Sequence, residues 1–359
     1  MNERRRLASM VLEGGQSLSH ACRVFGVTRK TGRKWVERAK EQGLDGMQSL
    51  SQAPQRVANK TKPEHETRLL ELHDEHRGDW KAKKLVDLMT NADIPTVSLR
   101  TANRILERHG RTTPRKLAAP MERFEREHPL ELLQMDFKGL SRETPYSILS
   151  VIDDATRYGL ALQAIPDKRG STVFDTLWGM FEEYGLPLQI LMDNGDCWGA
   201  PGSKAPTAFE ARLMLLGIQP IHGRPRHPQT QGKVERFHRT LKCELGDQLM
   251  QPTMAAAQHE LDWFLKRYNW VRPHDSLGGK TPGSRFAPSN RKRPATMPEH
   301  EIPHGAQSRK VDSEGFISFR GKEHKVGRGL TGHRVVIADT EAGLRLQFAG
   351  FDLALISEL

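Results

Sequence analysis

The length and charge of the chain limit the classes of protein to which it can belong. Its 359 residues exceed what one domain usually holds, so several domains are expected. A formal net charge of +11 favours a polyanion such as nucleic acid as partner. Three scattered cysteines without a CxxC pair, and the lack of an apolar run of about 18 residues, argue against a disulfide framework and a membrane span. We therefore expect a cytoplasmic protein with no membrane partner.

The positive charge is concentrated near the start of the chain. Residues 1–118 hold 24 Lys and Arg against 14 Asp and Glu, an excess of ten. Almost the entire net charge thus lies in the first third. Solvated surface is the simpler explanation, but the helical pattern of the same region favours DNA binding.

Residues 1–48 show the pattern of a helix-turn-helix domain. A short helix over 4–13 precedes one that Ser17 caps and Gly26 ends, and Thr28 opens a third that runs to Gly43. Helix, glycine-containing turn and helix are typical of this DNA-binding motif. Gly32 departs from the pattern, because the helix interior normally has an apolar residue there. Gly weakens a helix by about 1 kcal/mol relative to Ala.

The third predicted helix carries cationic side chains on its outward face. Such a face can reach phosphates and base edges in DNA. The candidate DNA-binding residues here are Arg29, Lys30, Arg33 and Lys34. An ordinary three-helix bundle is the alternative interpretation.

Residues 62–112 form a second predicted helical DNA-binding domain. Apolar residues recur at helical spacing over 66–76, 81–92 and 98–110. Ser98 is the expected cap of the last helix, and Arg100 and Arg104 lie on its exposed face. Two such domains in tandem can read a longer DNA site than one.

The middle of the chain alternates between strand and helix patterns. Strands are expected at 131–140, twice within 145–165, at 187–199 and at 218–223; helices are expected at 171–185, at 206–217 and from 229 to about 249. This order indicates a mixed α/β layer fold.

Two of these strands carry acids that should be partly buried. Asp136 lies within the first strand and Asp193 towards the C-terminal end of the fourth, where an unpaired buried carboxylate costs several kcal/mol. Glu235 stands alone in a strongly basic stretch, RPRHPQTQGKVERFHRTLK. Carboxylates from strand ends and a helix can converge to hold Mg²⁺ or Mn²⁺, which prefer oxygen ligands. Asp153 and Asp154 fit a turn better than a direct catalytic role.

The same basic stretch offers further candidate DNA contacts. Glu235, Arg239 and Lys242 share roughly one helical face, so the two cations could hold DNA beside a metal. Gln231 and Lys233 stand at the start of the helix, where a phosphate can bind. His227 could contact phosphate or only shape its loop. Solvated surface is the alternative for the basic side chains.

Four stretches resemble blocks of a known family. They are LLQMDFKG, LMDNGDCWG, HGRPRHPQTQGKVERFHRTLK and YNWVRPHDSLGGKTP. They resemble bacterial insertion-sequence transposases with a retroviral-integrase (DDE) catalytic core. The resemblance implies an RNase H-like core over 126–285, catalytic residues Asp136, Asp193 and Glu235, and two Mg²⁺ or Mn²⁺ ions per site. The 41 residues between Asp193 and Glu235 are slightly more than this superfamily usually has.

The remaining residues suggest a linker and a small domain. Residues 281–303 are rich in proline and basic side chains, as linkers often are. Residues 304–359 contain short alternating runs broken by glycine, which predicts a small antiparallel β-barrel.

Together these features predict a transposase. It would bind the terminal inverted repeats of its element and then cleave and join double-stranded DNA as a homo-oligomer, associated with the nucleoid when bound. Three rival interpretations are a non-catalytic DNA-binding regulator, a metal-dependent nuclease that does not join ends, and a structural nucleic-acid coat. The complete set of three acids argues against the regulator and the coat.

Overall fold

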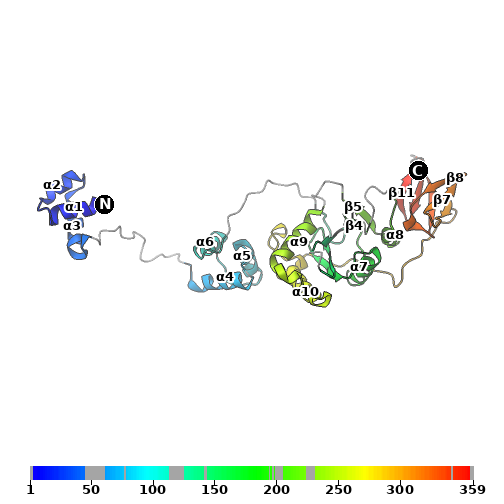
Figure 1. Cartoon of the computed structure of the whole chain (residues 1–359), viewed down its shortest axis with the longest axis horizontal. Helices are drawn as coiled ribbons and strands as arrows, with labels where there is room; N and C mark the ends of the chain where they lie inside the picture. Colours follow the sequence, from blue (N-terminus) through cyan, green and yellow to red (C-terminus); the bar gives the residue numbers. More distant parts are fainter. Residues whose placement is uncertain are drawn as a thin grey trace. The chain divides into compact units, whose positions relative to one another are not determined.

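The computed structural model describes residues 3–44, 61–76, 78–112, 125–140, 144–193, 195, 198, 205–223, 231–340 and 343–355. The chain divides into two compact units, residues 1–60 and 61–359 (Figure 1). No helix within the described ranges is long and apolar enough to cross a membrane.

The first unit is a three-helix bundle. Its helices are α1 (Glu3–Leu12), α2 (Leu18–Val24) and α3 (Arg29–Gln42). The Ser17 hydroxyl accepts the His20 N–H, and the Thr28 hydroxyl accepts the Thr31 N–H, so the predicted caps are confirmed. A small core that includes Leu7, Ala21 and Val36 joins the three helices.

Gly32 has a packing reason that helix propensity does not reveal. A Cβ atom at this position would lie 2.2 Å from the Sγ of Cys22 on α2. Glycine therefore lets α2 and α3 approach closely, and this close approach offsets the lower helix propensity of the residue.

The second unit begins with three more helices. They are α4 (Pro63–Glu75), α5 (Ala82–Asn91) and α6 (Leu99–Arg108). The Ser98 hydroxyl accepts the Thr101 N–H, as expected of the cap. Trp80, Leu85 and Ile105 belong to the core that these helices share.

A five-stranded mixed sheet forms the centre of this unit. Its strands are β1 (Leu132–Lys138), β2 (Ser147–Asp153), β3 (Gly159–Ile165), β4 (Gln189–Met192) and β5 (Gln219–His222), in the order β3-β2-β1-β4-β5. The first three strands pair antiparallel, whereas β4 and β5 run parallel to β1. The predicted strand and helix order is confirmed.

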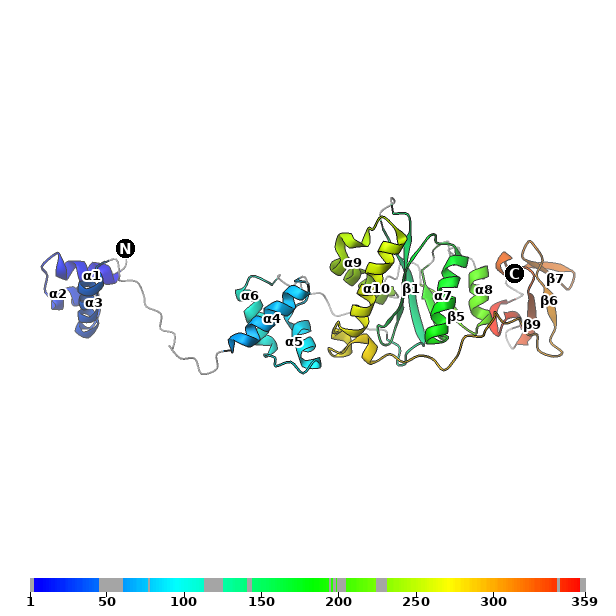
Figure 2. The same ribbon diagram turned by 90° about the horizontal axis from the view of Figure 1, so that it is seen from below.

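Helices cover both faces of the sheet. They are α7 (Gly170–Tyr184), α8 (Ala208–Leu215), α9 (Gly232–Leu245) and α10 (Met254–Trp270), and a short helical turn, η3 (Gly246–Leu249), follows α9. Leu149 and Val151 of β2 share a core with α7 and α8, whereas Ile148 and Ile152 share one with α9 and α10. Figure 2 shows these two layers. The alternation within β2 is that of a strand buried on both faces.

The C-terminal residues form open sheets, and the predicted barrel is not confirmed. The strands are β6 (Ser308–Lys310), β7 (Phe316–Phe319), β8 (Lys322–Lys325), β9 (Arg334–Thr340), β10 (Gly343–Phe348) and β11 (Phe351–Leu355). One sheet has the order β11-β10-β9-β6, and β7 pairs with β8. In the described part of the chain, β11 and β6 are therefore edges. A barrel requires strands long enough to tilt and stagger around a closed ring, and β6 has three residues.

Candidate active site

Asp136 lies near the end of the central strand β1 and points towards α9. Alternation along β1 places Leu133 and Met135 in the core with α7 and α8, and thus Asp136 on the opposite face. On that face, the Nδ1 of His238 lies 3.8 Å from the Asp136 Oδ2. The backbone N–H of Phe137 donates to Oδ1 at 2.7 Å.

Asp193 directly follows β4, the parallel neighbour of β1. The carboxyl ends of parallel strands lie at the same edge of a sheet, so β4 delivers Asp193 beside Asp136. Its Oδ1 accepts the Gly195 N–H at 3.0 Å and the Trp198 indole N–H at 2.5 Å.

Glu235 is the third carboxylate, on the first turn of α9, with an exposed side chain. Burial and the charges of Asp193 and Glu235 raise the pKa of Asp136 to about 6, although the Phe137 N–H opposes this shift. The charges of Asp193 and Glu235 thus act on Asp136, although Glu235 lies 99 residues further along the chain.

Such a group of carboxylates fits a divalent cation. The charges of Asp193 and Glu235 disfavour ionisation of Asp136, and a hard cation with oxygen ligands would remove that repulsion. Within the ranges that the structure describes, no three His, Cys, Asp or Glu side chains lie close enough together to hold a metal ion. The donor chemistry fits Mg²⁺ or Mn²⁺, and Glu235 stands on the solvent side.

Asp153 and Asp154 have structural partners. The Asp153 carboxylate accepts the Leu130 N–H at 2.7 Å and the Thr156 N–H and hydroxyl at 2.8 and 2.6 Å. Both aspartates are fully buried at the β2–β3 turn. These contacts support their interpretation as turn-forming residues.

Lys233, a predicted DNA contact, lies mostly buried against Asp154. Its ammonium lies 2.5 Å from the Asp154 Oδ1, and its side chain is mostly buried. Gln134 also donates to Asp154 and accepts the Val234 N–H, so this network fixes the start of α9 against β1. Sequence could not reveal this pairing, because Lys233 and Asp154 lie far apart along the chain.

Most of the other predicted DNA contacts have exposed side chains on the expected helices. The exposed side chains are Arg29, Lys30, Arg33 and Lys34 on α3, Arg100 and Arg104 on α6, and Arg239 and Lys242 on α9. Gln231 is half-buried at the start of α9. His227 lies outside the described residues. DNA contact by these residues stays a prediction.

Two residues near the acids, His238 and Trp198, were not predicted to support the site. His238 interrupts the apolar stripe Val234, Leu241 and Leu245 of α9, and its Nε2 lies 2.9 Å from the Ser150 hydroxyl. That polar residue in an apolar stripe was a usable signal. Trp198 lies in the family-like stretch LMDNGDCWG, but that stretch does not reveal that its indole N–H bonds Asp193.

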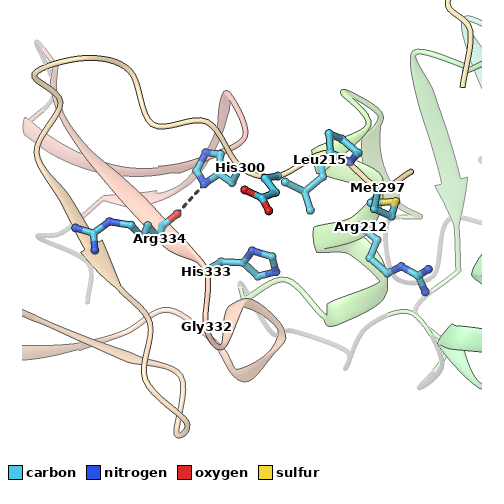
Figure 3. Close-up of a pocket in the computed structure, with 9 residues that line it drawn as sticks. Arg212, Leu215, Met297, His300, Gly332, His333 and Arg334 are labelled. Atoms are coloured by element: carbon cyan, nitrogen blue, oxygen red, sulfur yellow. Dashed lines mark hydrogen bonds between the residues drawn. The ribbon is translucent and has the colours of Figure 1, made fainter. Parts of the chain in front are cut away.

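A separate pocket of about 490 Å³ lies between α8 and the C-terminal strands, and none of the three acids lines it. Figure 3 shows Arg212 and Leu215 on one side and His300, His333 and Arg334 on the other. His300 donates from Nδ1 to the Arg334 carbonyl at 2.8 Å and accepts the Ala349 N–H at Nε2. These bonds hold His300 against the C-terminal sheet.

Family models agree with this arrangement. Two models, each described as an integrase core domain, match residues 126–228 and 216–282. A helix-turn-helix domain model matches residues 3–54, and a homeodomain-like domain model matches residues 31–106. The chain thus has an integrase core of the RNase H-like class, preceded by helix-turn-helix domains.

Curated relatives include proteins of bacterial insertion elements and a putative transposase. An uncharacterised 39.2 kDa protein of insertion element IS476 from Xanthomonas euvesicatoria is 25% identical over 236 residues, 64% of this chain and 66% of that protein. A putative transposase of Sinorhizobium fredii is 24% identical over 286 residues, 74% of this chain and 61% of that protein. A putative transposase for insertion element IS2E of Escherichia coli is 31% identical over 117 residues, 31% of this chain and 51% of that protein. The chain spans 51% to 66% of the length of these relatives.

The resemblance to insertion-sequence transposases with an integrase-type core is therefore confirmed. Among solved structures, the catalytic core of BIV integrase is 29% identical, with 43% of this chain and 92% of that chain covered and a TM-score of 0.34. The HTLV-2 integrase catalytic core in complex with magnesium is 17% identical, with coverage of 44% and 97% and a TM-score of 0.35. Both TM-scores lie below 0.5, so the assignment rests on the family models and the sequence relatives.

Proposed function

We propose that the chain is a transposase that binds the terminal inverted repeats of its element and catalyses DNA cleavage and strand transfer. The observation that supports this most is the placement of the acids in a region that matches an integrase core domain: Asp136 on β1, Asp193 directly after the parallel neighbour β4, and Glu235 on the first turn of α9. The expected reaction is hydrolysis of a phosphodiester bond, followed by attack of the freed 3′-hydroxyl on target DNA.

Asp136, Asp193 and Glu235 are the proposed ligands of two Mg²⁺ or Mn²⁺ ions. When bound, these ions would supply positive charge for the attacking and leaving oxygens of an in-line displacement. The chain itself positions the ligands: β1 holds Asp136, the Gly195 and Trp198 N–H groups orient Asp193, and α9 carries Glu235. No side-chain nucleophile is required.

DNA would be held by several parts of the chain. We propose four domains, with helix-turn-helix domains at 1–48 and 62–112, the catalytic core at 126–285 and a small β domain at 304–359. The exposed cations of α3 and α6 would bind the element ends, and Arg239 and Lys242 would hold the backbone beside Glu235. Two ends must be brought together for joining, so a homo-oligomer on DNA is expected.

A cleavage and joining assay tests this proposal. Labelled duplex DNA carrying the element end is incubated with Mg²⁺ or Mn²⁺ and wild type, Glu235→Gln or the control Glu183→Gln, which alters an exposed acid on α7. Loss of a metal ligand removes several kcal/mol of transition-state stabilisation, so Glu235→Gln should slow both reactions about 100-fold or more. DNA affinity should persist, and the control should match wild type.

The other outcomes point to the rival functions. Wild type that binds the element end but neither cuts nor joins it in Mn²⁺ would indicate a regulator. Cleavage without joining would indicate a nuclease. Full activity in Glu235→Gln would place the reaction away from these carboxylates.

A further inference from the structure

Trp198 lies in the glycine- and proline-rich stretch between Asp193 and α8, yet it is fully buried. Its indole N–H donates to the Asp193 Oδ1 at 2.5 Å. Its ring stacks on Phe137, with the ring centroids 4.8 Å apart and the planes inclined by 7°. Phe137 is the neighbour of Asp136 on β1. One side chain thus contacts Asp193 directly and the strand of Asp136 through its ring.

Glycine makes this contact possible. A Cβ at Gly195 would lie 2.9 Å from the Asp193 Oδ1 and 3.3 Å from the Trp198 Nε1. The Gly195 N–H donates to the same Oδ1. Two donors on one carboxylate oxygen fix the rotation of the group and turn Oδ2 away from both of them.

The backbone of Trp198 is anchored in turn to α8. Its carbonyl accepts the Thr207 hydroxyl at 3.0 Å, and Thr207 caps α8 in a reciprocal capping box with Glu210. The Glu210 Oε1 lies 2.8 Å from the Nε2 of His222 on β5. The Nδ1 of His222 lies 3.1 Å from the Asp193 carbonyl. Contacts therefore close a ring that begins and ends at Asp193.

We propose that Trp198 is a positioning residue that fixes the Asp193 carboxylate relative to β1, with Thr207, Glu210 and His222 as its support. This inference rests on the proposed function for its consequence, because Asp193 is a proposed metal ligand. It assigns a role to Trp198 in the stretch between Asp193 and α8. Partners that orient metal ligands typically change metal affinity or activity about 10- to 100-fold when they are removed.

The test compares Trp198→Phe with Trp178→Phe. Phenylalanine keeps an aromatic ring for stacking on Phe137 but has no N–H donor. Trp178 packs against the same core and carries Arg293 over its ring, so it is a matched control for loss of an indole. We expect Trp198→Phe to weaken Mn²⁺ binding at least about 10-fold, measured by calorimetry, and Trp178→Phe to leave it unchanged. Equal affinities in the two variants would overturn the proposal.

A second measurement needs neither metal nor activity. In the ¹H–¹⁵N spectrum of the full chain, the Trp198 indole resonance should move when Asp193→Asn removes the charged acceptor, whereas the Trp178 resonance should not. An unmoved Trp198 resonance would overturn the proposal even if Trp198→Phe failed to fold. Wild type that is inactive on DNA, with a Trp198 resonance that does move, would contradict the proposed function but support the positioning role.

Discussion

Gly32 lies at the closest approach of α2 and α3, against the Sγ of Cys22. Helix propensity alone suggests that Ala would stabilise α3 by about 1 kcal/mol. The structure predicts the opposite sign, because the added methyl group would overlap a buried sulfur. Side chains that approach too closely in a packed core typically cost about 1–3 kcal/mol.

Gly32→Ala should therefore lower the free energy of unfolding of the first unit by about 1–3 kcal/mol. Amide hydrogen exchange of α3 in the full chain measures this change. Cys22→Ala removes the sulfur. In that background, Gly32→Ala should therefore cost much less stability than it does in wild type. A more stable Gly32→Ala protein would show that α2 and α3 are not packed as described.

At the scale of elements, α9 presents two different faces. Val234, Phe237 and Leu241 pack against the sheet, whereas Glu235, Arg239 and Lys242 are exposed together. Their spacing follows the 3.6-residue period of a helix, so both faces could be predicted from sequence. One helix thus links the sheet, the third carboxylate and a cationic surface.

The exposed face of α9 gives a prediction for DNA binding. Arg239→Ala and Lys242→Ala should each weaken DNA affinity and reduce the slope of log affinity against log salt by about one, if each contacts one phosphate. Lys266→Ala, an exposed lysine on α10, is the control and should bind like wild type. Fluorescence anisotropy over a salt series measures these slopes. Unchanged slopes in both α9 variants would remove this face from the DNA interface.

Helix caps could be predicted from the sequence, whereas the closure of the C-terminal sheet could not. The caps at Ser17, Thr28 and Ser98 were predictable because each bonds a backbone N–H three residues further on. The predicted C-terminal barrel is not confirmed, since alternation and glycines reveal strands but not whether the last strand pairs with the first. The edges of that sheet depend on strand lengths and on pairing between distant residues.

At the scale of the whole molecule, the elements that carry the three acids were predictable, whereas the residues around the acids were not. Asp136 and Asp193 stand in or directly after strands, and Glu235 stands in a basic helix, so local patterns and family blocks both indicated them. Trp198 reaches Asp193 only through the folded loop. Glu244 of α9 likewise accepts the indole N–H of Trp80, 164 residues earlier in the chain, at 3.2 Å. Contacts of this kind have no local sequence pattern.

Binding of Mn²⁺ tests the three-carboxylate site most directly. Calorimetric titration should show ions bound by wild type and by Asp247→Asn, which neutralises an exposed acid just after α9. Asp136→Asn should lose most of this binding, because it removes the charge of a proposed metal ligand. Equal Mn²⁺ binding by Asp136→Asn and wild type would contradict the site proposed here.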